Sequence, residues 1–148
     1  MGSDTISNTS NINRLSIQMP SFTSPEAVVQ RQLDAYNAKD LDAWLSTYAE
    51  DAKQFELGGG LLAQGHEAIR ARASQRFKEP NLHALLLKRV VMGKVVIDHE
   101  DVVRTFPEGP GRVELVCVYV VEQGKIQSAT FSIGPPVLTP ATTDAVGQ

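Results

Sequence analysis

The sequence predicts an α+β domain in which three N-terminal helices are followed by a curved antiparallel sheet. Three observations support this prediction. Apolar residues recur at helical spacing in the first half of the chain, β-branched residues dominate the second half, and glycine-containing turns divide that second half into hairpins. Helices followed by paired strands are typical of α+β folds, and a strongly twisted sheet can curl around its helices to leave a cavity.

Length and composition limit the class of protein. A chain of 148 residues, 42% of them hydrophobic, is long enough for one packed domain. The net charge of −3 shows no basic excess, so nucleic acid is not an expected partner. No apolar stretch is long enough to span a bilayer. Cys117 is the one cysteine, which excludes an intramolecular disulfide and favours a cytoplasmic protein.

The folded domain is expected to cover residues 24–134. Residues 1–23 are rich in Ser, Asn and Thr without periodicity, which predicts a flexible N-terminal arm. Residues 135–148 contain three prolines and are expected to form an extended C-terminal tail.

Three segments have helical patterns. The first starts at Ser24, an N-cap residue followed by proline, and the second starts at Asp40, another good N-cap. The third follows Gly65 and is closed by Pro80. The apolar faces of these helices are, in order, Val29, Leu33 and Tyr36; Leu41, Trp44, Leu45 and Tyr48; and Ile69, Ala73 and Phe77.

Five segments have strand character: 53–57, 82–91, 95–106, 112–121 and 126–133. The first ends at the triplet Gly58–Gly60. Met92-Gly93 and Gln123-Gly124 predict hairpin turns between the later pairs, and residues 107–111 are expected to form a loop.

The stretch VVIDHEDVV at 95–103 places four polar residues inside an apolar strand. Because neighbouring side chains in a strand point to opposite faces, His99 and Asp101 share one face, and Asp98 and Glu100 share the other. One of these faces is expected to meet the core, where ionisable groups are costly unless they are paired or functional.

The string AYNAKDLDAWLSTYAEDA, followed by GHEAIR and by paired strands with a GKI turn, resembles the nuclear transport factor 2-like superfamily. Within it, the chain is most similar to ketosteroid-isomerase-like and SnoaL-like proteins over residues 25–133. The resemblance implies a cone-shaped sheet wrapped around three helices, with a pocket at its open end and frequent dimerisation through the outside of the sheet. The fold hosts isomerases, dehydratases, cyclases, epoxide hydrolases and binders, so it implies no single activity.

The resemblance also assigns candidate roles. In ketosteroid isomerases a carboxylate after the first strand is the general base, and a tyrosine with a protonated acid forms an oxyanion hole. These three positions fall on Glu56, Gln32 and Cys117, respectively. Neither Gln nor Cys replaces the missing strong donors, and losing one such donor costs about 10²–10³ in rate. Steroid isomerisation by that arrangement is therefore not expected. Glu56 is either the base or a solvated residue ahead of a turn.

The same comparison implies that Ile97, His99, Asp101 and Val103 point into the cone. A register slip of one residue would exchange the two faces. A three-residue turn at Gly93 would pair Leu85 with Asp101 and Leu87 with His99, whereas a two-residue turn would pair Leu86 with His99, and both remain open. His99 and Asp101 would form an acid–base pair, or else a satisfied histidine beside an arginine-paired carboxylate.

The remaining predicted pocket residues would bind the substrate, and they are Tyr36, Tyr48, Leu85, Leu87, Cys117, Tyr119 and Phe131. Arginines and a lysine on the third helix (Arg70, Arg72, Arg76 and Lys78) are interpreted as a solvated face. No metal-ligand spacing and no phosphate-binding loop occur, so no metal and no cofactor are predicted.

Two functions remain open. One is a cofactor-independent isomerase, dehydratase or cyclase acting by general acid–base chemistry on a small apolar carbonyl or hydroxyl compound, with Glu56, His99 and Asp101 as catalytic residues. The other is a non-catalytic binding module, which an outward-facing His99 would favour. In both cases Val116, Val118 and Val120 form an apolar outer patch that predicts a homodimer.

Overall fold

The computed structural model describes residues 24–140, so the predicted N-terminal arm and residues 141–148 of the predicted tail lie outside the described residues. The helices are α2 (Pro25–Ala38), α3 (Leu41–Ser46) and α4 (Gly65–Arg76). The strands are β1 (Tyr48–Glu56), β2 (Leu61–Gln64), β3 (His83–Met92), β4 (Val95–Phe106), β5 (Gly109–Glu122), β6 (Lys125–Ile133) and β7 (Val137–Leu138).

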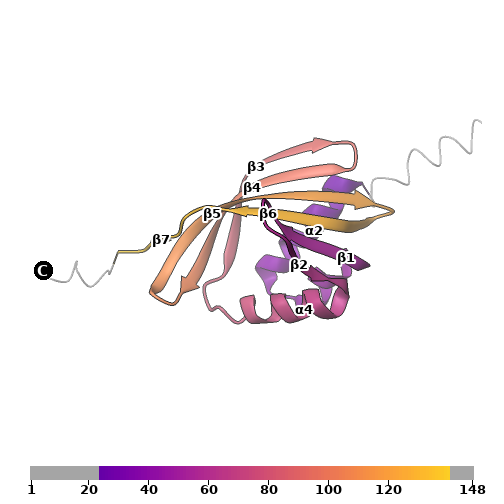
Figure 1. The fold of residues 1–148 in the computed structure, drawn as a ribbon. Coiled ribbons are helices and arrows are strands. Elements are labelled where there is room, and N and C mark those ends of the chain that lie inside the picture. The colour runs from indigo at the N-terminus through magenta and orange to yellow at the C-terminus, as the bar shows by residue number, and fades with distance from the viewer. Residues whose placement is uncertain (1–23, 141–148) are drawn as a thin grey trace, which may run out of the picture.

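The predicted α+β class and the curved sheet are confirmed. The strands form one sheet in the order β2-β1-β6-β5-β4-β3, with β7 added to β5. Neighbouring strands are antiparallel except for β1 and β6, which are parallel: after α4 the chain enters β3 at the far edge and returns strand by strand until β6 lies beside β1. Figure 1 shows the long strands bending over the helices, with α4 on the side away from β3.

Local signals place the helix boundaries. The Ser24 hydroxyl accepts a hydrogen bond from the Ala27 N–H at 3.2 Å, and the Asp40 carboxylate accepts one from the Ala43 N–H at 3.1 Å. Between them Lys39 adopts a left-handed conformation with φ of 56°, which ends α2. The N-caps expected from the sequence are therefore used.

The sheet extends beyond the predicted strands. β1 starts at Tyr48, which the sequence pattern assigned to the second helix, so α3 is only six residues long. β2 was not predicted, and β5 starts at Gly109, inside the expected loop 107–111, with Gly109 opposite Phe106. Residues of the expected tail add β7, where Val137 pairs with Arg112. These extra strand residues are held by pairing with other strands, and a short stretch of sequence does not show which strands will pair.

The core lies between the helices and the inner face of the sheet. Trp44, Leu45 and Ile69 are buried, as predicted, and Phe77 is half-buried against them. The Phe77 ring stands edge-on to Tyr36, with 5.4 Å between their centroids. These aromatic contacts close one end of the space that the sheet encloses.

The β3–β4 hairpin matches neither predicted register in full, and only the predicted pair of Leu85 with Asp101 occurs. Met92 pairs with Val95 around a two-residue Gly93-Lys94 turn, and Gly93 has a φ of 59°. An irregularity between Leu86 and Lys88 then shifts the pairing, so that Lys88 lies opposite His99 while Leu85 lies opposite Asp101.

Candidate functional site

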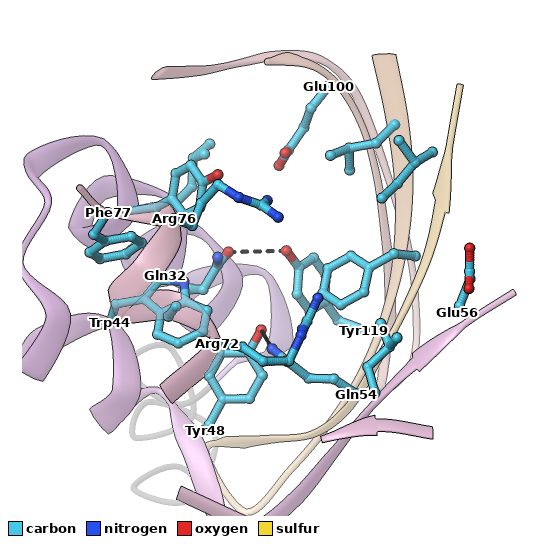
Figure 2. A pocket seen from close by; sticks show the side chains of 17 residues that line it. Gln32, Trp44, Tyr48, Gln54, Glu56, Arg72, Arg76, Phe77, Glu100 and Tyr119 are labelled. Atoms are coloured by element: carbon cyan, nitrogen blue, oxygen red, sulfur yellow. Dashed lines mark hydrogen bonds between the residues drawn. The ribbon is translucent and has the colours of Figure 1, made fainter. Parts of the chain in front are cut away.

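A cavity of about 200 Å³ lies between the three helices and the inner face of the sheet. Six aromatic side chains contribute to its walls: Tyr36, Trp44, Tyr48, Phe77, Tyr119 and Phe131. Figure 2 shows several polar side chains among these rings, directed toward the same space. An apolar cavity with a few converging polar groups is the usual form of a small-molecule site.

The strand β4 presents to this interior the face opposite to the one predicted. Asp98 is fully buried and Glu100 is 6% exposed, together with Val96 and Val102. The predicted inward orientation of Ile97, His99, Asp101 and Val103 is therefore wrong. Within residues 95–103, each face of β4 carries two ionisable residues, so the hydrophobicity of the side chains could not show which face lies inside.

His99 and Asp101 form ion pairs on the outer face of the sheet. His99 Nε2 lies 2.7 Å from Glu114 Oε1, and Asp101 pairs with Arg112, which holds the pKa of Asp101 below its usual value. Neither residue lines the cavity. The predicted catalytic pair is thus replaced by two cross-strand contacts with β5. The Asp101 contact agrees with the alternative of an arginine-paired carboxylate, whereas His99 is not the pocket-wall histidine of its alternative.

Asp98 is neutralised inside the fold by Arg89 of β3. The guanidinium donates to both carboxylate oxygens at 2.7 and 2.9 Å, and its third contact is with Gln30 of α2 at 2.8 Å. The side chains of Arg89 and Asp98 are 9% and 0% exposed. This bidentate pair lies in directly opposed positions of β3 and β4, and it fixes which face of β4 is inside.

Because the inward face of β4 is the opposite of the predicted one, Glu100 is the ionisable group of this strand that lines the cavity. No hydrogen bond or ion pair joins its carboxyl group to another residue of the range 24–140. Burial, reinforced by the negative charge of Asp98 and opposed by Arg89, raises the pKa of Glu100 to about 7. A carboxyl group with this pKa can both accept and donate a proton near neutral pH.

Tyr119 and Gln32 form a buried polar contact below Glu100. The Tyr119 hydroxyl donates to Gln32 Oε1 at 3.2 Å, as Figure 2 shows. Because this contact uses the Gln32 oxygen, the two amide N–H groups of Gln32 are left to donate to a ligand. The position that the resemblance assigns to a tyrosine therefore still carries a hydrogen-bond donor, although a weaker one.

Two arginines of α4 also line the cavity, and the sequence interpretation missed them. Arg72 Nη1 donates to Gln54 Oε1 at 2.6 Å, and the Gln54 amide reaches the Tyr48 hydroxyl at 3.4 Å. Arg76, one turn later, also belongs to the cavity wall. Their i, i+4 spacing places them on one helix face with Ala73 and Phe77, a signal that the sequence contained. Arg70, in contrast, is exposed and pairs with Asp42.

The other predicted site residues divide into three groups. Tyr36, Tyr48, Tyr119 and Phe131 line the cavity, and so does Glu56, although its side chain is largely exposed at the end of β1. Leu85 and Leu87 are 53% and 48% exposed on β3 and do not contribute. Cys117 faces inward but is buried in the core, and burial raises the pKa of its thiol.

The described part of the chain contains neither a metal-binding cluster nor a membrane-spanning helix. Within residues 24–140 no three His, Cys, Asp or Glu side chains gather in a way that could hold a metal ion. None of the helices in that range combines the length and the apolarity needed to cross a bilayer.

Fold and cavity together define a class of protein: an α+β domain whose curved sheet and helices enclose an aromatic small-molecule-sized space. The family model of the SnoaL-like domain matches residues 29–129, and the chain belongs to this family within the nuclear transport factor 2-like superfamily. No match was found among curated proteins.

Solved structures of similar proteins agree with this assignment. An uncharacterised cystatin-fold protein from Novosphingobium aromaticivorans is 26% identical, with a TM-score of 0.67 over 73% of this chain and 97% of that one. A putative polyketide cyclase from Sinorhizobium meliloti is 27% identical, with a TM-score of 0.61 over 70% and 92%. A protein of ketosteroid-isomerase-like fold from Catenulispora acidiphila, solved with trimethylamine, is 17% identical, with a TM-score of 0.61 over 70% and 82%.

Proposed function

We propose that this protein is a cofactor-independent acid–base enzyme that isomerises, dehydrates or cyclises a small apolar compound carrying a carbonyl or hydroxyl group. The observation that supports it is Glu100, a buried carboxyl group in an aromatic cavity whose pKa is raised to about 7. The similarity to a putative polyketide cyclase points to the same group of reactions. Perturbed carboxyl groups in cavities are characteristic of catalytic sites.

In this proposal Glu100 transfers the proton. As a carboxylate it removes a proton from a carbon next to a carbonyl group, and as the acid it returns that proton to another position or to a leaving hydroxyl. The Gln32 amide, with its oxygen held by Tyr119, would hydrogen-bond the substrate oxygen where negative charge develops. Glu56, at the exposed end of β1, takes no part in the transfer.

Proton abstraction can be tested without knowing the natural substrate. We expect wild-type protein to accelerate deuterium incorporation at the α-carbon of 2-tetralone in D₂O, followed by NMR. Glu100→Gln keeps the size of the side chain but cannot accept the proton, so we expect the accelerated rate to fall about 100-fold, within the range found for general bases.

Glu114→Gln is the matched control because Glu114 is an exposed carboxylate on the outer face of β5. We expect it to exchange at the wild-type rate. Equal rates for wild type and Glu100→Gln would contradict the role of Glu100, and so would a larger loss in Glu56→Gln than in Glu100→Gln.

A non-catalytic binding module is the second candidate, favoured by the outward position of His99 and Asp101. The cavity would then hold an apolar ligand, and its polar groups would only orient it. Saturable binding of 2-tetralone without any accelerated exchange would support this function over the enzymatic one.

We also propose that the protein is a homodimer through the outer face of the sheet. Val90, Ile97 and Val118 occupy one cross-strand row of β3, β4 and β5, and Val120 follows on the next row. Val90 is 48% exposed in the single chain. Such a continuous apolar face is rarely left in contact with water.

The dimer predicts a concentration-independent mass of two chains in sedimentation at micromolar concentrations. Val118→Lys places a charge at the centre of the apolar rows and is expected to give monomers. Leu57→Lys is the control, since Leu57 is 64% exposed at the end of β1, away from these rows. A monomeric wild-type protein would refute the proposal.

A further inference from the structure

Two guanidinium groups face the cavity from one side of α4. Arg72 and Arg76 are four residues apart, and both line the cavity. Figure 2 shows Arg76 directed toward the space between Tyr119 and Glu100, and Arg72 beside Gln54 and Tyr119. Arg72 remains exposed on the open side of the cavity, and Arg76 is half-buried. A ligand in the cavity would therefore lie beside two cations as well as the aromatic rings.

The positive charge at this wall is only partly balanced by neighbouring carboxylates. Arg72 hydrogen-bonds the neutral Gln54 amide, and no salt bridge joins it to a carboxylate of residues 24–140. Glu79 is already bound by Arg104 at 2.9 Å through both oxygens and accepts the Thr105 N–H at 3.0 Å. Arg76 approaches the same carboxylate only to 3.5 Å, so one carboxylate serves two guanidinium groups.

The electrostatics of the neighbouring groups agree with an excess of positive charge. Partial burial, together with the charge of Arg76, lowers the pKa of Arg72. Arg76 also lies beside the Tyr36 hydroxyl, where it opposes the larger effect of burial, which raises the pKa of Tyr36. An anion between the two arginines would relieve their mutual repulsion.

We propose that the cavity takes a planar apolar compound that carries a carboxylate, with Arg72 and Arg76 binding the carboxylate and the aromatic rings holding the rest. This deepens the proposed function, on which it rests, by naming the substrate class of the same site. Guanidinium groups bind carboxylates through paired, charge-assisted hydrogen bonds.

A single negative charge fits this cavity better than a phosphate. Glu100 lies on the sheet side of the cavity, opposite α4, and would repel a second charge on the ligand. With its carboxylate bound by Arg72 and Arg76, the ligand would place its apolar part among the aromatic side chains of the cavity. Its carbonyl or hydroxyl group would then lie near Glu100 and Gln32.

The test compares two probes of nearly equal shape, 2-naphthoate and the neutral 2-naphthamide, by NMR titration of the full chain at neutral pH. We expect wild-type protein to bind the acid at least about tenfold more tightly than the amide. Arg72→Gln with Arg76→Gln should remove this preference while leaving the affinity for the amide unchanged, which also shows that the double variant is folded. Arg70→Gln, which alters an exposed arginine of the same helix, should keep the preference.

Three outcomes would overturn the inference: equal affinity for the two probes, binding of neither probe, or an unchanged preference in the double variant. The readout is equilibrium binding, so it is independent of the exchange experiment. A missing charge preference contradicts the carboxylate inference alone, whereas a normal preference without deuterium exchange contradicts proton transfer by Glu100 alone.

Discussion

Arg89→Met is expected to lower the free energy of unfolding by about 3–5 kcal/mol, because it leaves the Asp98 carboxylate buried without its partner. The side chain of Asp98 is 0% exposed, and Arg89 supplies both of its short hydrogen bonds. Methionine retains most of the apolar length of arginine, so lost packing contributes little. Urea denaturation of the two proteins measures the difference.

Two further variants make this prediction specific. Arg112→Met removes the cation of the Asp101 pair, but the Arg112 side chain is 60% exposed, and we expect a much smaller change than for Arg89→Met. Arg89→Met combined with Asp98→Leu removes both charges and should recover most of the lost stability. If Arg89→Met and Arg112→Met cost the same, the buried pair does not hold β4 in place.

Glu100→Gln is expected to change the pH dependence of stability. The folded-state pKa of Glu100 is about 7, above the ordinary value of 4.5. A raised pKa means that the folded protein holds this proton more tightly than the unfolded chain. The stabilisation is therefore fully present below pH 4.5 and is lost as the pH rises through about 7.

Glutamine cannot ionise, so the free energy of unfolding of the Glu100→Gln variant does not fall in this way as the pH rises. Relative to wild type, Glu100→Gln should gain about 3 kcal/mol in free energy of unfolding between pH 4.5 and pH 8.5, since each pKa unit corresponds to about 1.4 kcal/mol. Urea denaturation at both pH values measures the gain, and Glu108→Gln, at an exposed position of the turn between β4 and β5, should show none. A constant difference between Glu100→Gln and wild type at all pH values would contradict the raised pKa.

Arg89→Met and Glu100→Gln both test how the inner face of β4 accommodates two buried carboxyl groups. Asp98 and Glu100 occupy neighbouring inward positions of β4, and only Asp98 has a cation. Asp98 is thereby paired as part of the structure, whereas Glu100 is destabilised as an anion, which is the property that the proposed activity requires. Stability measurements on Arg89 and Glu100 therefore test the electrostatic basis of the proposed activity without a substrate.

Much of the site could be predicted from the sequence where the signal is local. Tyr36, Tyr48, Tyr119 and Phe131 line the cavity, although Tyr48 does so from β1 and not from the predicted second helix. Arg72 and Arg76 were missed although their spacing places them beside Ala73 and Phe77. Charged runs on a helix are usually solvated, and only the position of α4 against the sheet shows which turn faces the cavity.

The sequence by itself determined the order of helices and hairpins, the helix N-caps at Ser24 and Asp40 and the Gln123-Gly124 turn, because each depends on residues close together in the chain. Only the tertiary structure decided which face of β4 is inside. Its two faces carry equivalent polar pairs, and the choice rests on Arg89 from β3, which binds Asp98 and is itself held by Gln30 from α2 only in the folded protein. That choice moves His99 out of the cavity and Glu100 into it, since alternate side chains of a strand cannot share a face with their neighbours.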